Sequence, residues 1–376
     1  MNIAFLTTLN PNDINSWSGT TFNVFNTLKK RHNVKVVGIN MLLQLASYSS
    51  GNFSGKSTID RYSQILGNLC SEQIKLFSGC DLIFFGDLYL APFLQVNMPI
   101  IHFSDVTYHS FRDYLDRKED ENTIQKIEMI EKKLLTEKYT TIIYSSEWAK
   151  LNAIKYYGID PRKIHIVEFG ANIPTPEDYI IEIGVKVCNL VFIGKNWVKK
   201  GGDKVLGAYY KLKSEGFPCT LTIIGSVPET LEGEKDLTII PFLNKSNPIH
   251  MKKLCNILKN AHFLVLPTEY DAFGIVFCEA SAYAVPSIAT NVCGVGQPIH
   301  EGKNGYLLSS DATAEDYAEK IKTVFKDKEN YYKLRASSRH EFETRLNWEV
   351  WEKKVNKIFE ETVLNYKKTH FQLINY

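Results

Sequence analysis

Residues 263–290 read FLVLPTEYDAFGIVFCEASAYAVPSIAT. The apolar run at 263–266 is short and rich in large aliphatic residues, which predicts a strand buried on both faces. Gly274 then opens a run with helical spacing, and Pro286 is expected to end it, because the residue before proline avoids the α region. Residues 287–290 predict the next strand. The stretch is therefore a strand–loop–helix–strand unit, which binds ligands beyond the carboxyl ends of its strands.

Two carboxylates mark this unit. Asp271 lies in the predicted loop, and Glu279 lies in the second turn of the predicted helix. Acidic side chains near a helix N-terminus are commonly simple partners of the helix dipole. The alternative is a ligand site, in which Glu279 accepts ribose hydroxyls and Asp271 contacts a sugar, while the free N–H groups of the helix attract phosphate.

The residues from Asp271 to Ala280, followed by Ala284-Val-Pro286 and Ala289-Thr290, resemble a known signature. It is the E-x7-E motif of retaining glycosyltransferases, specifically glycosyltransferase family 4. Asp271 stands where the first glutamate usually stands and is one methylene shorter. The resemblance implies an α/β chain with two doubly wound Rossmann-like domains facing a cleft, the GT-B fold.

Length and composition agree with a large soluble protein. The chain has 376 residues, for which two domains are expected, and 44% hydrophobic and 23% charged residues. A formal net charge of +2 gives no reason to expect nucleic acid as the partner. No apolar run approaches the ~20 residues that span a bilayer, and the start, MNIAFLTTL, lacks the pattern of a signal peptide. The seven cysteines form no C-x-x-C pair, so we expect reduced thiols, no zinc site and a cytoplasmic protein.

A strand–helix alternation runs through both halves of the chain. We expect an acceptor-side domain at 1–172, a linker at 173–187, a nucleotide-sugar domain at 188–345, and a terminal helix at 346–376 that crosses back to the first domain, as the resemblance implies. This last helix is predicted to end near Tyr366.

Three features of the first half leave a choice open. Gly19 matches a glycine that lies against the donor phosphates in the resembled family, although a turn glycine at a helix start needs no ligand. Residues 51–57 resemble a phosphate-binding loop, but the glycines are one residue too close and no strand precedes them, so we reject that function. Lys132-Lys133, in the charged helical region 114–137, suggests either contact with an acidic membrane surface or, as we favour, a solvated helix face.

A nucleotide-sugar donor leaves negative charge on its β-phosphate, which a cation must stabilise. Lys195 and Lys200 bracket a glycine-flanked loop where the resembled family has an arginine and a lysine on the pyrophosphate. Backbone amides at the helix start would add donors, and the loop around Leu243 is expected to contact the base. The expected donor-binding amides belong to Phe273, Gly274, Ile275 and Val276.

The catalytic position of the first half is Asp105, which stands where many family members have a histidine after a strand. It could contact the donor sugar or the acceptor hydroxyl, or it could cap the turn at 105–107. His102, three residues earlier, lies within the predicted strand and is expected to be packed.

We therefore expect a retaining glycosyltransferase with Asp105, Asp271 and Glu279 as catalytic residues. It would need no metal for catalysis and would move a sugar from a UDP- or GDP-sugar to a saccharide or lipid-linked acceptor in surface glycan synthesis. One alternative is a nucleotide-sugar epimerase on the same fold. Another is a non-catalytic nucleotide-sugar-binding subunit.

Overall fold

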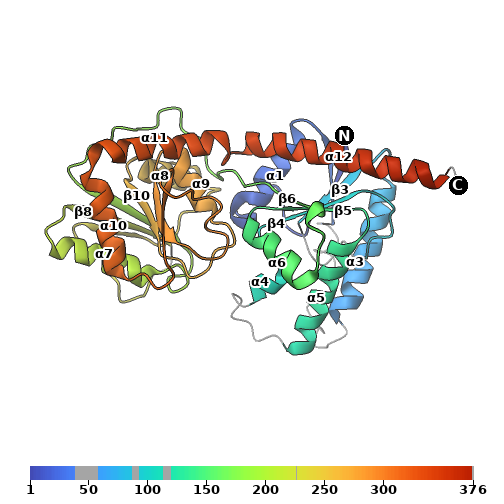
Figure 1. Cartoon of the computed structure of the whole chain (residues 1–376), viewed down its shortest axis with the longest axis horizontal. Helices are drawn as coiled ribbons and strands as arrows, with labels where there is room; N and C mark the ends of the chain where they lie inside the picture. The colour runs from blue at the N-terminus through green and yellow to red at the C-terminus, as the bar shows by residue number, and fades with distance from the viewer. Residues whose placement is uncertain (39–57, 87–92, 113–119, 226, 375–376) are drawn as a thin grey trace. The chain divides into compact units, whose positions relative to one another are not determined.

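A computed structural model describes residues 1–38, 58–86, 93–112, 120–225 and 227–374. The chain folds into two compact units, an N-terminal unit, Met1–Val167 with Glu352–Tyr376, and a C-terminal unit, Glu168–Trp351. Each unit holds one six-stranded parallel sheet with helices packed on it (Figure 1). The chain thus has two Rossmann-like domains. The rejected phosphate-loop pattern at 51–57 lies outside the described residues.

The N-terminal sheet has the order β2-β1-β3-β4-β5-β6. Its strands are β1 (Asn2–Leu6), β2 (Asn33–Val37), β3 (Leu82–Phe85), β4 (Ile100–Ser104), β5 (Thr140–Tyr144) and β6 (Ile164–Ile166). The helices of this unit are α1 (Thr20–Lys29), α3 (Thr58–Lys75), α4 (Tyr108–Arg112), α5 (Glu121–Thr136) and α6 (Glu147–Tyr157), with short 3-10 turns η1 (Ser16–Gly19) and η3 (Pro161–Lys163).

Aromatic rings fill the core of the N-terminal unit. Phe84 stacks on Phe103 with centroids 4.6 Å apart, and Phe359 of the terminal helix meets Phe84 edge-on at 5.4 Å. That helix, α12 (Trp348–Ile374), is 27 residues long. The predicted end near Tyr366 was wrong, because no proline or glycine interrupts the helix-compatible sequence that follows.

The C-terminal sheet has the order β12-β11-β10-β7-β8-β9. Its strands are β7 (Cys188–Gly194), β8 (Cys219–Gly225), β9 (Leu237–Ile240), β10 (Phe263–Leu266), β11 (Ser287–Thr290) and β12 (Gly305–Leu308). The helices are α7 (Gly202–Ser214), α8 (Pro248–Lys259), α9 (Ile275–Ala282), α10 (Ala314–Lys326) and α11 (Lys328–Thr344). The strand order reverses between β7 and β10, which makes the loops after these two strands the expected ligand site.

A buried arginine holds the segment before β7 onto the C-terminal unit. Arg335 on α11 is fully buried, and its guanidinium donates to the carbonyls of Ile180, Ile181 and Ala261. Because a buried guanidinium needs acceptors for its N–H groups, these carbonyls fix the chain there. Residues 180 and 181, predicted to be a linker, are therefore hydrogen-bonded to the C-terminal unit.

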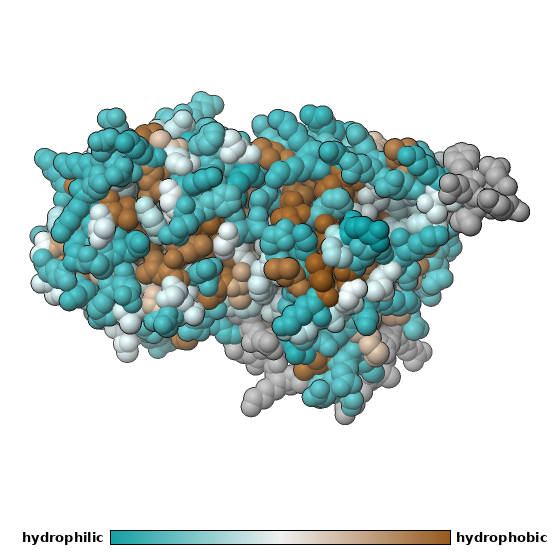
Figure 2. Space-filling model, viewed as in Figure 1, coloured by the Kyte–Doolittle hydropathy of each residue, from teal (hydrophilic) through white to brown (hydrophobic). Residues whose placement is uncertain are grey.

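The strands around the quoted stretch lie where the sequence predicts them, at 263–266 and 287–290. The helix between them ends at Ala282, earlier than Pro286 requires, and Ala284 adopts a positive φ of 57°. Among the described residues no helix is long and apolar enough to cross a membrane. On the face drawn in Figure 2, hydrophilic residues cover most of each unit, and hydrophobic residues are visible in smaller patches on each.

Candidate functional site

The loops after β7 and β10 are tied together at the point where the strand order reverses. The Glu269 amide donates to the Lys199 carbonyl at 2.9 Å, and the Thr268 hydroxyl donates to the same oxygen at 3.2 Å. Both loops follow buried parallel strands, so they leave the sheet at the same edge. Sequence positions about 70 residues apart therefore form one surface.

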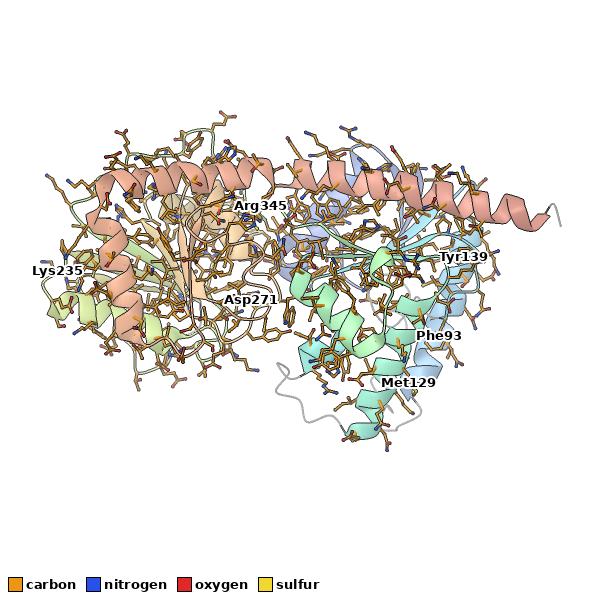
Figure 3. All side chains as sticks on the ribbon, in the orientation of Figure 1. Phe93, Met129, Tyr139, Lys235, Asp271 and Arg345 are labelled. Carbon is orange, nitrogen blue, oxygen red and sulfur yellow. The ribbon has the colours of Figure 1, made fainter. Side chains whose placement is uncertain are left out.

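Lys200 joins the two loops through its charge. Its Nζ lies 2.7 Å from Asp271 Oδ2 and donates to the Tyr270 carbonyl at 3.0 Å. The two side chains are 17% and 20% exposed, so solvent reaches both of them. Asp271 lies on the loop that follows β10 (Figure 3). Lys200 and Asp271, predicted from separate motifs, are brought together.

Gly201 makes this approach possible. It has a φ of 74°, and a Cβ built on it would lie 2.0 Å from the Pro267 carbonyl oxygen. Only glycine fits there, because it tolerates a positive φ and has no side chain to meet the opposite loop. Gly201 also directly precedes α7, so it sets where Lys200 lies relative to that helix.

Helix α9 points its first turn at the same edge. Gly274 precedes it with a φ of 85°, and the amides of Ile275 and Val276 lie in the first turn, where the helix supplies no acceptor. The Phe273 side chain is buried against Phe169, with ring centroids 5.2 Å apart. Phe273 can therefore offer a ligand only its backbone.

Glu279 is the charged residue of an otherwise apolar or small helix, and it is 2% exposed. Its Oε1 accepts from Nζ of Lys245, which comes from the segment 241–247 between β9 and α8. Lys245 was not predicted from the sequence. The only signal for it is a cation two residues after Leu243, in a polar run that ends at the start of α8.

The other predicted donor contacts lie on the same loops. Lys195 Nζ is 5.8 Å from the ring centroid of Phe242, which is half-exposed, and Leu243 is buried beside it in sequence. The Leu243 side chain thus packs inward. Among the described residues, no group of three or more His, Cys, Asp or Glu side chains is arranged to hold a metal ion.

Two predicted residues belong to the N-terminal unit. Gly19 directly precedes α1 and has a φ of 100°; it follows Trp17 and Ser18, whose φ values of 47° and 56° are also positive. Non-glycine residues in this region are strained, and such strain collects at functional sites. Asp105 follows β4, and the turn after it is capped by Ser104, whose Oγ accepts the Val106 amide at 3.2 Å. Since β1 and β4 are parallel strands of one sheet, both residues lie at its carboxyl edge.

Two other residues near the predicted site positions are packed in the interior, and for His102 this is as predicted. His102 is fully buried, and burial lowers its pKa to about 3; within the described part of the chain neither ring nitrogen has a hydrogen-bond partner. Cys278 is fully buried too, and burial raises the pKa of its thiol well above the usual range. Neither group is prepared for catalysis at neutral pH.

Comparison with known proteins points to one family. Residues 186–341 match the family model described as "Glycosyl transferases group 1". An uncharacterized glycosyltransferase of Methanocaldococcus jannaschii is 28% identical over 174 residues, which cover 46% of this chain and 47% of that protein. The capsular polysaccharide biosynthesis glycosyltransferase CapM of Staphylococcus aureus is 26% identical over 46% of each chain. The chain spans about half the length of the curated relatives it matches.

The fold is shared over nearly the whole chain. The crystal structure of Anabaena HepE in complex with UDP-glucose superimposes with a TM-score of 0.65 over 96% of this chain and all of that one, at 13% identity. The matched residues include α9 and the loops after β7 and β10, the two switch-point loops at which the strand order reverses. Residues 186–341 are therefore similar to the glycosyl transferases group 1 family, in a chain that has the GT-B fold.

Proposed function

We propose that this chain is a retaining glycosyltransferase that moves a sugar from a UDP- or GDP-sugar to a glycan or lipid-linked acceptor. The observation that carries the proposal is the pairing of Lys200 with Asp271 on the loops after β7 and β10, directly before the helix α9 that carries Glu279. These are the charges and amides that a nucleoside diphosphate requires. They lie within the residues that match the family.

The diphosphate is the part of the donor that this site suits best. Lys200 and Lys195 supply positive charge, and the amides of α9 with the helix dipole stabilise the charge that develops on the β-phosphate. These groups act without a metal ion in the proposed reaction. Lys200 must then transfer its contact from Asp271 to phosphate, which frees the Asp271 carboxylate to accept hydroxyls of the sugar.

The nucleoside lies at the other carboxylate. Glu279 accepts the ribose hydroxyls, and backbone groups near Leu243 contact the base. The acceptor is assigned to the N-terminal unit, where Asp105 contacts the acceptor hydroxyl or the sugar and Gly19 allows close approach of the donor phosphates. Retention needs no separate protein base, because the leaving phosphate can take the acceptor proton.

Two similar proteins support the choice of substrates. HepE was crystallised with UDP-glucose, and CapM acts in capsular polysaccharide biosynthesis. By analogy we assign a UDP-sugar as the first donor to test and a surface glycan as the product class. The reaction is assigned to the cytoplasm, with peripheral contact to the inner membrane face when the acceptor is lipid-linked.

A binding screen followed by a turnover assay tests this function. UDP-, GDP- and ADP-sugars are compared by thermal shift; a ligand at a hundred times its Kd stabilises the folded protein by about 2.7 kcal/mol. Binding with transfer to a glycan or lipid-linked acceptor supports the proposal. Donor isomerisation without acceptor would indicate an epimerase, and binding without turnover a non-catalytic subunit. No shift with any nucleotide sugar would refute it.

A further inference from the structure

An ion pair links the segment 241–247 to α9. Lys245 Nζ contacts Glu279 Oε1, and the two side chains are 17% and 3% exposed. The rest of α9 reads Ile-Val-Phe-Cys before the glutamate and Ala-Ser-Ala after it, and all of these residues except Ile275 are buried. A buried carboxylate in such surroundings needs a partner.

Stability alone does not explain the pair. Replacing a buried ion pair by apolar side chains of similar volume is often neutral or stabilising. Leucine or methionine at both positions would suit a helix that is already apolar. The charge on Glu279 is therefore kept for a purpose outside the packing of α9.

A hydroxyl-binding role gives that purpose. An ionised carboxylate only accepts hydrogen bonds, so it can receive both hydroxyls of a ribose, whereas a protonated one must also donate. Hydrogen bonds to a charged acceptor are also the stronger ones. Lys245 contacts Oε1, and a contact to one oxygen favours an orientation in which Oε2 receives the hydroxyls.

The backbone around Lys245 is fixed independently of the pair. Asn244 Oδ1 accepts the Ser246 amide at 2.9 Å, and Asn247 Oδ1 accepts the amides of Ile249 and His250 at 2.9 and 3.3 Å. These turns fix the backbone on both sides of Lys245. The backbone that carries the Lys245 ammonium is therefore held by hydrogen bonds that do not involve Glu279.

We propose that Lys245 is a positioning residue of the donor site, which pairs with Glu279 and orients it for the ribose hydroxyls. The inference rests on the proposed function, since it assumes a nucleoside diphosphate at this site. Lys245 acts through Glu279 and does not itself touch the ligand. Its effect must therefore show in how the protein distinguishes ribose from deoxyribose.

The test compares the Kd of UDP and of 2′-deoxy-UDP by isothermal titration, with GDP and 2′-deoxy-GDP in parallel. We expect the wild type to prefer the ribonucleotide by about 10- to 100-fold, the range of one hydrogen bond to a charged group. Lys245→Met should reduce this ratio to below about threefold, and Lys245→Arg should keep most of it. Lys213→Met is the matched control, because it removes a lysine from a surface pair with Asp236 in the same unit.

Two further variants cover the case in which Lys245→Met unfolds. Glu279→Gln should lose the discrimination, and adding Lys245→Met to it should change the Kd of UDP by less than about threefold, since no orphaned charge remains. A wild-type ratio in folded Lys245→Met overturns the inference. A further loss of about tenfold in the double variant also overturns it, because Lys245 would then contact the nucleotide directly. If the wild type binds neither UDP nor GDP, the proposed function itself has failed.

Discussion

Replacing Gly201 by alanine tests the geometry that joins the two switch-point loops. An alanine Cβ would lie 2.0 Å from the Pro267 carbonyl oxygen and 2.6 Å from its carbon. Both atoms belong to a proline backbone that follows β10, so the opposite loop cannot turn aside locally. The whole Lys195–Gly201 loop must move, and Lys200 with it.

Two effects lower the free energy of unfolding of Gly201→Ala. A left-handed φ costs an L-residue about 1–2 kcal/mol, and overpacking adds roughly 1–3 kcal/mol. Gly216 provides the control, since its φ of 70° is similar but a Cβ there meets nothing within 4 Å. Gly216→Ala has the cost of the left-handed φ without a clash, and the lower entropy of the unfolded chain affects both variants equally. The difference between the variants therefore isolates the clash.

Urea denaturation of both variants measures this difference, and thermal unfolding gives a second estimate. We expect Gly201→Ala to lose about 3 kcal/mol, which lowers the Tm of a unit of this size by about 6–12 °C. Gly216→Ala should lose about 1 kcal/mol. UDP or GDP binding should weaken only in Gly201→Ala, because Lys200 is displaced. Equal stabilities of the two variants would refute the reasoning.

Three other substitutions have defined outcomes. Lys200→Met should weaken UDP or GDP binding at least about tenfold, the value of a lost charged hydrogen bond, and an unchanged Kd by titration would contradict the phosphate contact. Arg335→Met should cost about 3 kcal/mol in urea denaturation, because buried carbonyls lose their donors at about 1–3 kcal/mol each; a loss below about 1 kcal/mol would show that water replaces them. Burial raises the pKa of the Glu131 carboxyl to about 7 from an ordinary 4.5. The folded state therefore binds this proton more tightly than the unfolded state, and the free energy of unfolding falls as the pH rises from 4.5 to about 7. Glu131→Gln should remove this part of the pH slope of unfolding, and identical slopes for both proteins would disprove it.

The strands were predictable because parallel strands buried on both faces read as continuous apolar runs. Residues 263–266 and 287–290 show this. The contact between Lys200 and the loop after β10 also followed, since the carboxyl ends of parallel strands share an edge. These features depend on local pattern and on topology alone.

What the sequence did not predict depends on capping and tertiary contact. Helix α8 begins at Pro248 after Asn247, whose side chain accepts two amides of the first turn; this asparagine–proline pair was a usable signal. The short helix α4 also follows a capping residue, because Thr107 Oγ1 accepts the Ser110 amide at 3.2 Å. Its first amide, that of Tyr108, donates to the buried carboxylate of Glu131 on α5 at 2.9 Å. No pattern within a five-residue helix could show a partner 23 positions away.

The two lysine–carboxylate pairs of the proposed site differ in burial, and this difference gives them different roles. The side chains of Lys200 and Asp271 are 17% and 20% exposed, so water reaches both charges, and separating them costs less than separating a pair with a fully buried carboxylate. The side chain of Glu279 is 3% exposed, and losing its lysine would leave a charge in an apolar helix at a cost of several kcal/mol. Donor binding can therefore exchange the first pair, with Lys200 moving to phosphate, while the second must persist. In the proposed reaction this makes Asp271 a carboxylate that becomes available only when the diphosphate is bound, and Glu279 one that is ready before it arrives.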